Sequence, residues 1–323
     1  LTVAGAFSVV YNLTESLRER RWSMRGTAWG PAAAGVAAAL LVVVLANLDG
    51  AIQLVQGAGK VLFSGDSFPS FDFWRSTRMM PTQSEGITEF PYFTFLFADL
   101  HAHLIAIPFT LLVAGLALNL VLSTEESGFR WSVLLLPFAA LALAIGSLAA
   151  INTWDYPSYL LLGIGSLALG YYAYHRRVDG RLLATVVIGG ALLVGLSYLA
   201  FLPFHQRYIG FNLGVESSAF QTGLHRYVAI HGLFLFLALS YLIYEARESL
   251  GRLLLSIGGF RAVMRRRVLL IVASLAMVAI GLITGYLTVI VLLLLMALVV
   301  FLATRQLMDH GDETPHHLFL LAL

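Results

Sequence analysis

Residues 103–121 read HLIAIPFTLLVAGLALNLV, a run without an acid, a lysine or an arginine. A helix needs about 20 apolar residues to cross the hydrocarbon core of a bilayer, so this run predicts a membrane-spanning helix. Similar runs recur along a chain that is 59% hydrophobic and only 12% charged. Because the runs lack the strict apolar–polar alternation of barrel strands, we expect the spans to be helices.

The remaining apolar runs complete the predicted bundle. Further spans are expected at 31–47, 132–150, 158–174, 182–202 and 227–244, with partial ones at 1–11 and from 317 onward. The run at 268–304 is too long for one crossing and carries Gly281, Gly285 and Tyr286 near its middle, which predicts a tight helical hairpin. The predicted fold class is an all-α polytopic transmembrane bundle, with residues 1–323 as a single transmembrane domain. Both ends stand inside apolar runs, so we expect a piece of a longer protein.

Basic residues predict how the bundle is oriented. Loops taken alternately place 15 of the 20 Lys and Arg residues at 13–30, 122–131, 175–181, 245–267 and 304–316. By the positive-inside rule this side is expected to be cytoplasmic. The opposite loops, 48–102, 151–157 and 203–226, would then face outward from a plasma membrane.

Several kinds of chemistry are excluded by what the chain lacks. It has no cysteine, so disulfides, thiolate nucleophiles and cysteine metal sites are excluded. A phosphate-binding glycine loop, a GxSxG motif and an HExxH motif are also missing from the sequence. The basic segments adjoin apolar spans, where anionic membrane lipids account for them, so no nucleic-acid partner is expected.

The long outer loop, residues 48–102, concentrates acids, histidines and aromatics. Asp49 follows the second span directly, and Asp72 stands between aromatics shortly before Arg75 and Arg78. On a helix the two arginines would share one face and clamp an anionic group. The alternatives are a solvated helix end for Asp49 and a surface salt bridge with an aromatic anchor for the arginines.

The densest constellation is ITEFPYFTFLFADLHAH at residues 87–103. If Asp99 is helical, it shares a face with His103, four residues later. His103 would then be a base that the Asp99 carboxylate holds in one tautomer. Together with Glu89 and His101 they would also make a tentative site for a divalent metal, Mg²⁺ or Mn²⁺. The alternative is that these groups cap and anchor the start of the following helix.

The two shorter outer loops add further candidates. Asp155, two residues before Pro157, fits the start of a helix and is also a catalytic candidate. His205 and Arg207 lie in an aromatic and basic loop that suits a phosphorylated lipid head group, or ordinary phospholipid contact.

Four segments together carry a family resemblance: FDFWRSTR at 71–78, the block at 87–103, INTWDYPSY at 151–159 and LSYLAFLPFHQRY at 196–208. They resemble signature segments of the Chloroflexi and archaeal "YYY" membrane protein family, a group of unknown function. That family is similar, more distantly, to the C-type (GT-C) glycosyltransferases. The resemblance implies a GT-C-like fold and inverting transfer of a sugar from a polyprenyl-phosphate-type donor to a protein or lipid acceptor outside the cytoplasm. The first outer loop departs from the pattern, because it has no Asp-Asp or Asp-x-Asp pair.

Such a transfer needs a base, cations for the departing phosphate and an apolar groove for the lipid tail. Asp72, Glu89 and Asp99 are the base candidates, with Asp49 a weaker one. Arg75, Arg78 and Arg207 are the phosphate candidates. A non-catalytic polytopic subunit or scaffold and a lipid transporter remain alternatives, although mid-span sequences of plain Leu, Ala, Val and Gly argue against transport.

Overall fold

The computed structural model describes residues 1–20, 30–44, 47–80, 86–98, 100–209, 221–255, 272, 274–283 and 285–309. Every regular element in these ranges is a helix, so the all-α prediction is confirmed. The chain divides into two compact units, each described by itself below. Unit 1 comprises Leu1–Leu45, Thr94–Leu213 and Gln306–Leu323, and unit 2 comprises Ala46–Phe93 and Gly214–Arg305.

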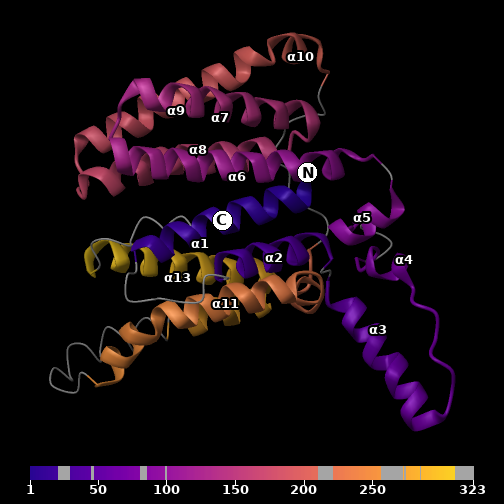
Figure 1. Ribbon diagram of the computed structural model, residues 1–323. Coiled ribbons are helices and arrows are strands. Elements are labelled where there is room, and N and C mark those ends of the chain that lie inside the picture. Colours follow the sequence, from indigo (N-terminus) through magenta and orange to yellow (C-terminus); the bar gives the residue numbers. More distant parts are fainter. Residues whose placement is uncertain are drawn as a thin grey trace. The chain divides into compact units, whose positions relative to one another are not determined.

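Unit 1 is a bundle of long helices. Its elements are α1 (Thr2–Arg20), α2 (Gly30–Val43), α6 (Ala102–Ser127), α7 (Trp131–Ile151), α8 (Asp155–His175), α9 (Gly180–Ala200) and the short α10 (Leu202–Arg207). Figure 1 shows α6, α7, α8 and α9 side by side along their lengths, and α1 packs on both α2 and α6. The core side chains are fully buried, among them Val113, Leu141, Ile145, Leu148 and Leu193.

Glycine allows α7 and α9 to approach closely. A Cβ atom on Gly146 would lie 2.5 Å from the Ser197 carbonyl oxygen and 2.7 Å from the Phe201 ring. The first of these atoms belongs to the backbone, so it cannot move aside without separating the two helices. Close approach at small residues is the main source of packing energy between helices in a bilayer, where lipid tails are as apolar as leucine.

Gly146→Ala is therefore expected to lower the free energy of unfolding by about 1–3 kcal/mol, the usual cost of overpacking. Thermal unfolding of the purified protein in detergent measures the change. Gly165→Ala is the matched control, because the space around Gly165 is open and alanine favours a helix. A Gly146→Ala protein as stable as the Gly165→Ala protein would contradict the predicted close contact.

Unit 2 contains α3 (Leu48–Gly59), a π-helical turn η1 (Lys60–Ser64), α4 (Phe73–Ser76), the start of α5 (Pro91–Phe97), α11 (Leu224–Leu255), a helix at Ser274–Ile283 and most of α13 (Leu287–Asp309). α3 packs against α11, where Leu48 lies over the backbone of Gly232. The Thr288 hydroxyl donates to the Thr222 carbonyl at 2.7 Å and links α13 to the segment before α11.

The predicted break in the run at 268–304 is confirmed. One helix ends at Ile283, Gly285 has a φ of +80°, and α13 begins at Leu287. A Cβ atom on Gly281 would lie 3.0 Å from the Leu287 Cα atom, so the two helices meet closely just beyond the turn. Only glycine adopts the backbone of Gly285 without strain.

Among the described residues, four helices are long and apolar enough to cross a membrane: Ala102–Ser127, Ser132–Ile151, Gly180–Ala200 and Leu224–Tyr244. Gly30–Val43 and Leu48–Ser64 reach that length and hydropathy only when taken together. The prediction of a polytopic membrane protein is thus confirmed. The span expected at 31–47 ends earlier, at Val43, and a new helix starts at Leu48, where the sequence predicts the beginning of a long loop.

Candidate functional site

The first turn of α3 places a carboxylate inside unit 2. The Asn47 side chain caps the helix by accepting the Asp49 N–H at 3.2 Å. From that start Asp49, Gln53 and Gly57 follow at intervals of four residues, so they share one face of the helix, and all three are buried. α3 therefore turns polar side chains inward, toward α4.

The Gln53 amide joins α3 to the start of α4. Its Nε2 donates to the Asp49 Oδ2 at 2.8 Å and to the Asp72 carbonyl at 2.9 Å, while its Oε1 accepts the Asp72 N–H at 2.8 Å. Asp72 is the N-cap of α4, and its Oδ1 accepts the Arg75 N–H at 2.9 Å. These bonds fix the Asp72 backbone relative to Asp49.

Asp49 holds the guanidinium of Arg75. The Arg75 Nη2 and Nε donate to Asp49 Oδ1 at 2.7 and 3.1 Å, and the Ser76 hydroxyl donates to Oδ2 at 2.7 Å. The Asp49 side chain is 9% exposed and that of Arg75 is 47% exposed. Arg75 Nη1 has no partner among the residues that the structure describes. The ion pair therefore presents a cation of fixed orientation at the surface of unit 2, with donors left for a ligand.

Arg75 lies on the rim of a depression of about 360 Å³, called here the Arg75 groove. Its lining consists of two cations, one carboxylate, two aromatic rings and small or polar groups: Lys60, Arg75, Asp72, Phe68, Phe71, Gln53, Gln56, Pro69 and Ser70. Lys60 begins the π-helical turn, an irregularity often found at functional sites. Phe68 lies against the backbone of Gly57, where a Cβ atom would be only 2.5 Å from the ring. The groove suits an anionic group joined to a ring or an apolar chain.

Arg78 does not accompany Arg75 into this groove. α4 ends at Ser76, so the two arginines do not share a helical face, and the geometric basis of the predicted clamp is wrong. The Arg78 guanidinium lies 4.3 Å from the centre of the Trp74 ring, and its Nη1 is 3.5 Å from Glu89 Oε1. The surface salt bridge with an aromatic anchor, the alternative interpretation of Arg78, matches this geometry.

In unit 1, the charge of His103 acts on the Asp155 carboxylate. His103, in the first turn of α6, lies 3.5 Å from the Thr94 hydroxyl through Nε2, and its ring stacks with that of His101. Asp155 begins α8, ahead of the predicted span at 158–174, and accepts from Asn152 Nδ2 at 3.0 Å. Burial raises the pKa of the Asp155 carboxyl, against the opposing effects of the Asn152 hydrogen bond and the charge of His103.

The other candidates have simpler surroundings. His205 and Arg207 lie on α10, where the His205 ring stacks on Tyr198 with centres 4.3 Å apart. Asp99, and with it the predicted Asp99–His103 pair, lies outside the described residues. Within the part of the chain that is described, no three His, Asp or Glu side chains gather as metal ligands. The tentative metal set of Glu89, Asp99, His101 and His103 includes the undescribed Asp99, so it stays a prediction.

Asp155→Asn is expected to change how stability depends on pH. The folded state raises the pKa of this acid, so the protonated form is favoured on folding, and the native protein loses stability as pH rises from the unfolded value near 3.8 through the folded pKa. Asparagine keeps the acceptor for Asn152 and cannot ionise. The melting temperature of the variant minus that of the wild type should therefore increase with pH, measured in detergent between about pH 4 and about pH 7. A difference that stays constant over that range would contradict the burial of this carboxyl.

Sequence reasoning missed three residues of the site. Gln53 and Ser76 hold Asp49 in place, and Lys60 supplies the second cation of the groove. Two signals were available: Gln53 follows Asp49 by four residues, and Lys60 is one of only five basic residues in the predicted outer loops. Ser76 gave no signal, because its contact with Asp49 joins residues 27 positions apart.

The comparisons with known proteins concern the whole chain. The family model described as "Uncharacterized membrane protein (DUF2298)" matches residues 1–323. Neither the curated proteins nor the solved structures give a match. The family match agrees with the membrane-spanning helices described above and names no activity. Because it extends over the full sequence, the chain belongs to the uncharacterised membrane protein family DUF2298.

Proposed function

We propose that the chain is a membrane glycosyltransferase that moves a sugar from a polyprenyl-phosphate-type donor to a protein or lipid acceptor. The observation that supports this is the Arg75 groove, where a fixed, half-exposed guanidinium, a lysine and a carboxylate line one depression. Phosphate is a strong ligand for arginine, whose donors match its oxygens in pairs. In a lipid-linked sugar phosphate, the phosphate would contact the two cations, the sugar the polar groups, and the start of the lipid chain the aromatic rings of this lining.

The groove supplies the charges that an inverting transfer needs. The acceptor hydroxyl oxygen attacks the anomeric carbon and forms the new glycosidic bond, while the bond between that carbon and the phosphate oxygen breaks. The leaving polyprenyl phosphate keeps the electron pair, and Arg75 and Lys60 stabilise its added negative charge. The Asp72 carboxylate accepts the proton of the attacking hydroxyl. Asp49 acts as a positioning residue, because its oxygens are occupied by Arg75, Ser76 and Gln53.

α3 and the following turn η1, which carries Lys60, also suit a lipid-linked substrate. Their exposed side chains include Val55 on α3, which is 72% exposed, and Leu62 and Phe63 on η1, of which Phe63 is 89% exposed. Apolar side chains in contact with lipid cost nothing in a bilayer and would be unfavourable in water. A polyprenyl tail in the adjacent leaflet is therefore compatible with a phosphate bound at Lys60 and Arg75.

The orientation and the metal requirement remain part of the proposal. From the distribution of basic residues, the groove would face the outside of the plasma membrane. A divalent metal at Glu89, Asp99, His101 and His103 is a prediction without a described ligand set, so no step above depends on one.

Mass spectrometry of surface glycans and lipid-linked sugars tests the proposal in cells that carry the intact gene, a deletion or Asp72→Asn. The expected result is the loss of one glycan in both mutants and accumulation of its lipid-linked sugar. Unchanged pools in the deletion strain would overturn the transferase assignment. A glycan lost in the deletion strain but fully restored by Asp72→Asn would instead support a non-catalytic subunit or scaffold, whereas a lipid-linked sugar confined to one side of the membrane would support a transporter.

A further inference from the structure

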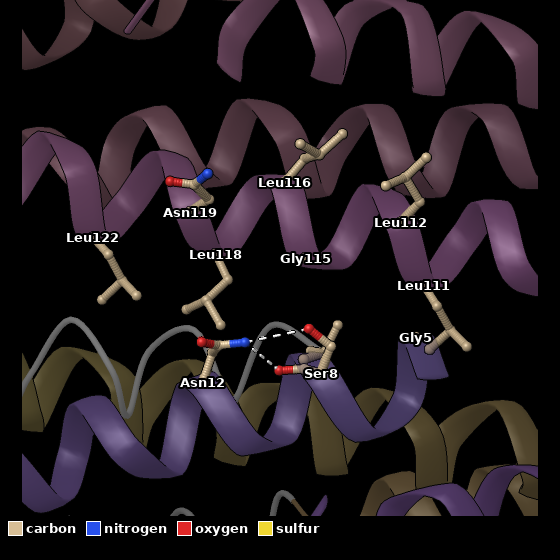
Figure 2. Close-up of a pocket in the computed structure, with 11 residues that line it drawn as sticks. Gly5, Ser8, Asn12, Leu111, Leu112, Gly115, Leu116, Leu118, Asn119 and Leu122 are labelled. Carbon is tan, nitrogen blue, oxygen red and sulfur yellow. Dashed lines mark hydrogen bonds between the residues drawn. The ribbon is translucent and has the colours of Figure 1, made fainter. Parts of the chain in front are cut away.

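A second groove lies in unit 1, between α1 and α6. It has a volume of about 410 Å³, and Figure 2 shows that residues of α1 and α6 line it. Gly5 on α1 and Gly115 on α6 line it, and a Cβ atom on Gly5 would lie only 3.1 Å from the Leu111 side chain. None of the candidate residues of the proposed reaction lines it.

The two ends of this α1–α6 groove differ in polarity. Figure 2 shows Asn12 on α1 and Asn119 on α6 toward the same end, with Asn119 on the side of α6 away from α1, and it shows Gly5 and Leu111 at the other end. Both asparagines stand eight residues before the last residue of their helices, Arg20 and Ser127. Eight residues of α-helix correspond to about 12 Å. The interfacial layer on each side of a bilayer is about 5–7 Å thick, and Glu15 and Arg18 form an ion pair one to two turns beyond Asn12. A pair of helices that end at the membrane surface would place these amides at the boundary between the hydrocarbon and the interfacial layer.

Each amide has one hydrogen-bonding group left over. Asn12 Nδ2 donates to the Ser8 carbonyl at 2.7 Å, and Asn119 Oδ1 accepts from the Ser123 hydroxyl at 2.8 Å. The Asn12 carbonyl and the Asn119 amino group have no partner among the described residues, and both side chains are exposed. At this boundary, where water is scarce, unpaired polar groups of this kind are costly. A ligand of the groove would relieve this cost by bringing one acceptor and one donor.

We propose that the α1–α6 groove binds one glycerophospholipid whose head group carries a hydrogen-bond donor. An ester or phosphate oxygen of the lipid accepts from Asn119, and a head-group hydroxyl or ammonium donates to Asn12. One acyl chain lies along Gly115 toward Gly5. The asparagines lie toward the end of α6 opposite to His103, so this lipid belongs to the leaflet on the side of the basic loops. It is therefore a different molecule from the proposed sugar donor, and its binding does not depend on the proposed function.

Photoreactive phosphatidylglycerol tests the site in the full chain reconstituted in nanodiscs. One probe carries a diazirine near the glycerol and the other carries it at the end of an acyl chain, and mass spectrometry maps the labelled residues. The first probe is expected to label around Asn12 and Asn119, and the second around Gly5 and Leu111. The reverse order, or even labelling of all lipid-facing helices, would overturn the proposal.

Variants show whether the labelling depends on the groove. Gly115→Leu should reduce it about tenfold, because a Cβ atom there meets Val9 only at an ordinary 3.5 Å and the rest of the side chain fills the groove. Gly195→Leu, in open space on α9, is the matched control and should leave it unchanged. Asn12→Leu and Asn119→Leu should each reduce it about threefold, the usual effect of one hydrogen bond in a membrane. Thermal unfolding confirms that each variant is folded. Equal labelling of Gly115→Leu and wild type, or crosslinking of a second polypeptide in the groove instead of lipid, would also overturn it.

Discussion

Arg75→Ala is expected to lower the rate of sugar transfer by about 10²–10³-fold, the usual effect of removing one preorganised donor that stabilises transition-state charge. The loss should fall mainly on kcat, since negative charge on the phosphate grows as the glycosidic bond to it breaks. Arg75→Lys should recover only part of the activity. A single ammonium group cannot replace the Nε and Nη2 hydrogen bonds to Asp49 and at the same time bind a phosphate in the groove. Steady-state kinetics with a purified lipid-linked donor measure these changes.

Arg78→Ala is the matched control for this prediction. It removes the same side chain three positions away, where the guanidinium contacts Trp74 and Glu89 and does not line the groove. Its effect on transfer should be much smaller than that of Arg75→Ala. Equal losses in two proteins of equal thermal stability would favour the arginine clamp that the sequence predicts and would contradict the site described here.

A double-mutant cycle identifies the part played by Asp49. Asp49→Asn keeps the size of the side chain and removes the charge that orients Arg75. It should lower kcat in the same direction as Arg75→Ala, and the double variant should be little worse than Arg75→Ala alone, because both changes disrupt one unit. Additive losses would show that Asp49 acts independently of Arg75.

Asp72→Asn is expected to reduce transfer about 10²–10⁴-fold, the range typical of a lost general base. Stability should change little, because asparagine caps a helix as well as aspartate does and can still accept the Arg75 N–H.

Asp66→Asn is the matched control for the base. Asp66 is an exposed acid in the same unit that does not line the groove, so this variant should keep wild-type rates. If Asp72→Asn keeps activity within about threefold of the wild type, Asp72 is not the base. If Asp66→Asn loses as much activity as Asp72→Asn, the loss reflects removal of a negative charge in general and not the loss of a proton acceptor.

The class of fold follows from the amino-acid sequence, because the cost of unpaired backbone groups in lipid leaves helices as the solution for long apolar runs. The break near Gly285 was also predictable from the sequence, since a run of that length cannot cross once and only glycine favours the backbone found there.

The tertiary structure alone decided which acids and cations act together. Local spacing paired Arg75 with Arg78, yet α4 is only one turn long, and Arg75 contacts Asp49, which lies 26 positions earlier. Spacing likewise paired His103 with Asp99, whereas in the described residues the charge of His103 acts on Asp155, at the start of another helix. Helical periodicity relates residues within about one turn, but a buried carboxylate takes its partners from whichever elements fold against it. Asp49, the weakest base candidate by sequence, is therefore the residue around which the proposed site is organised.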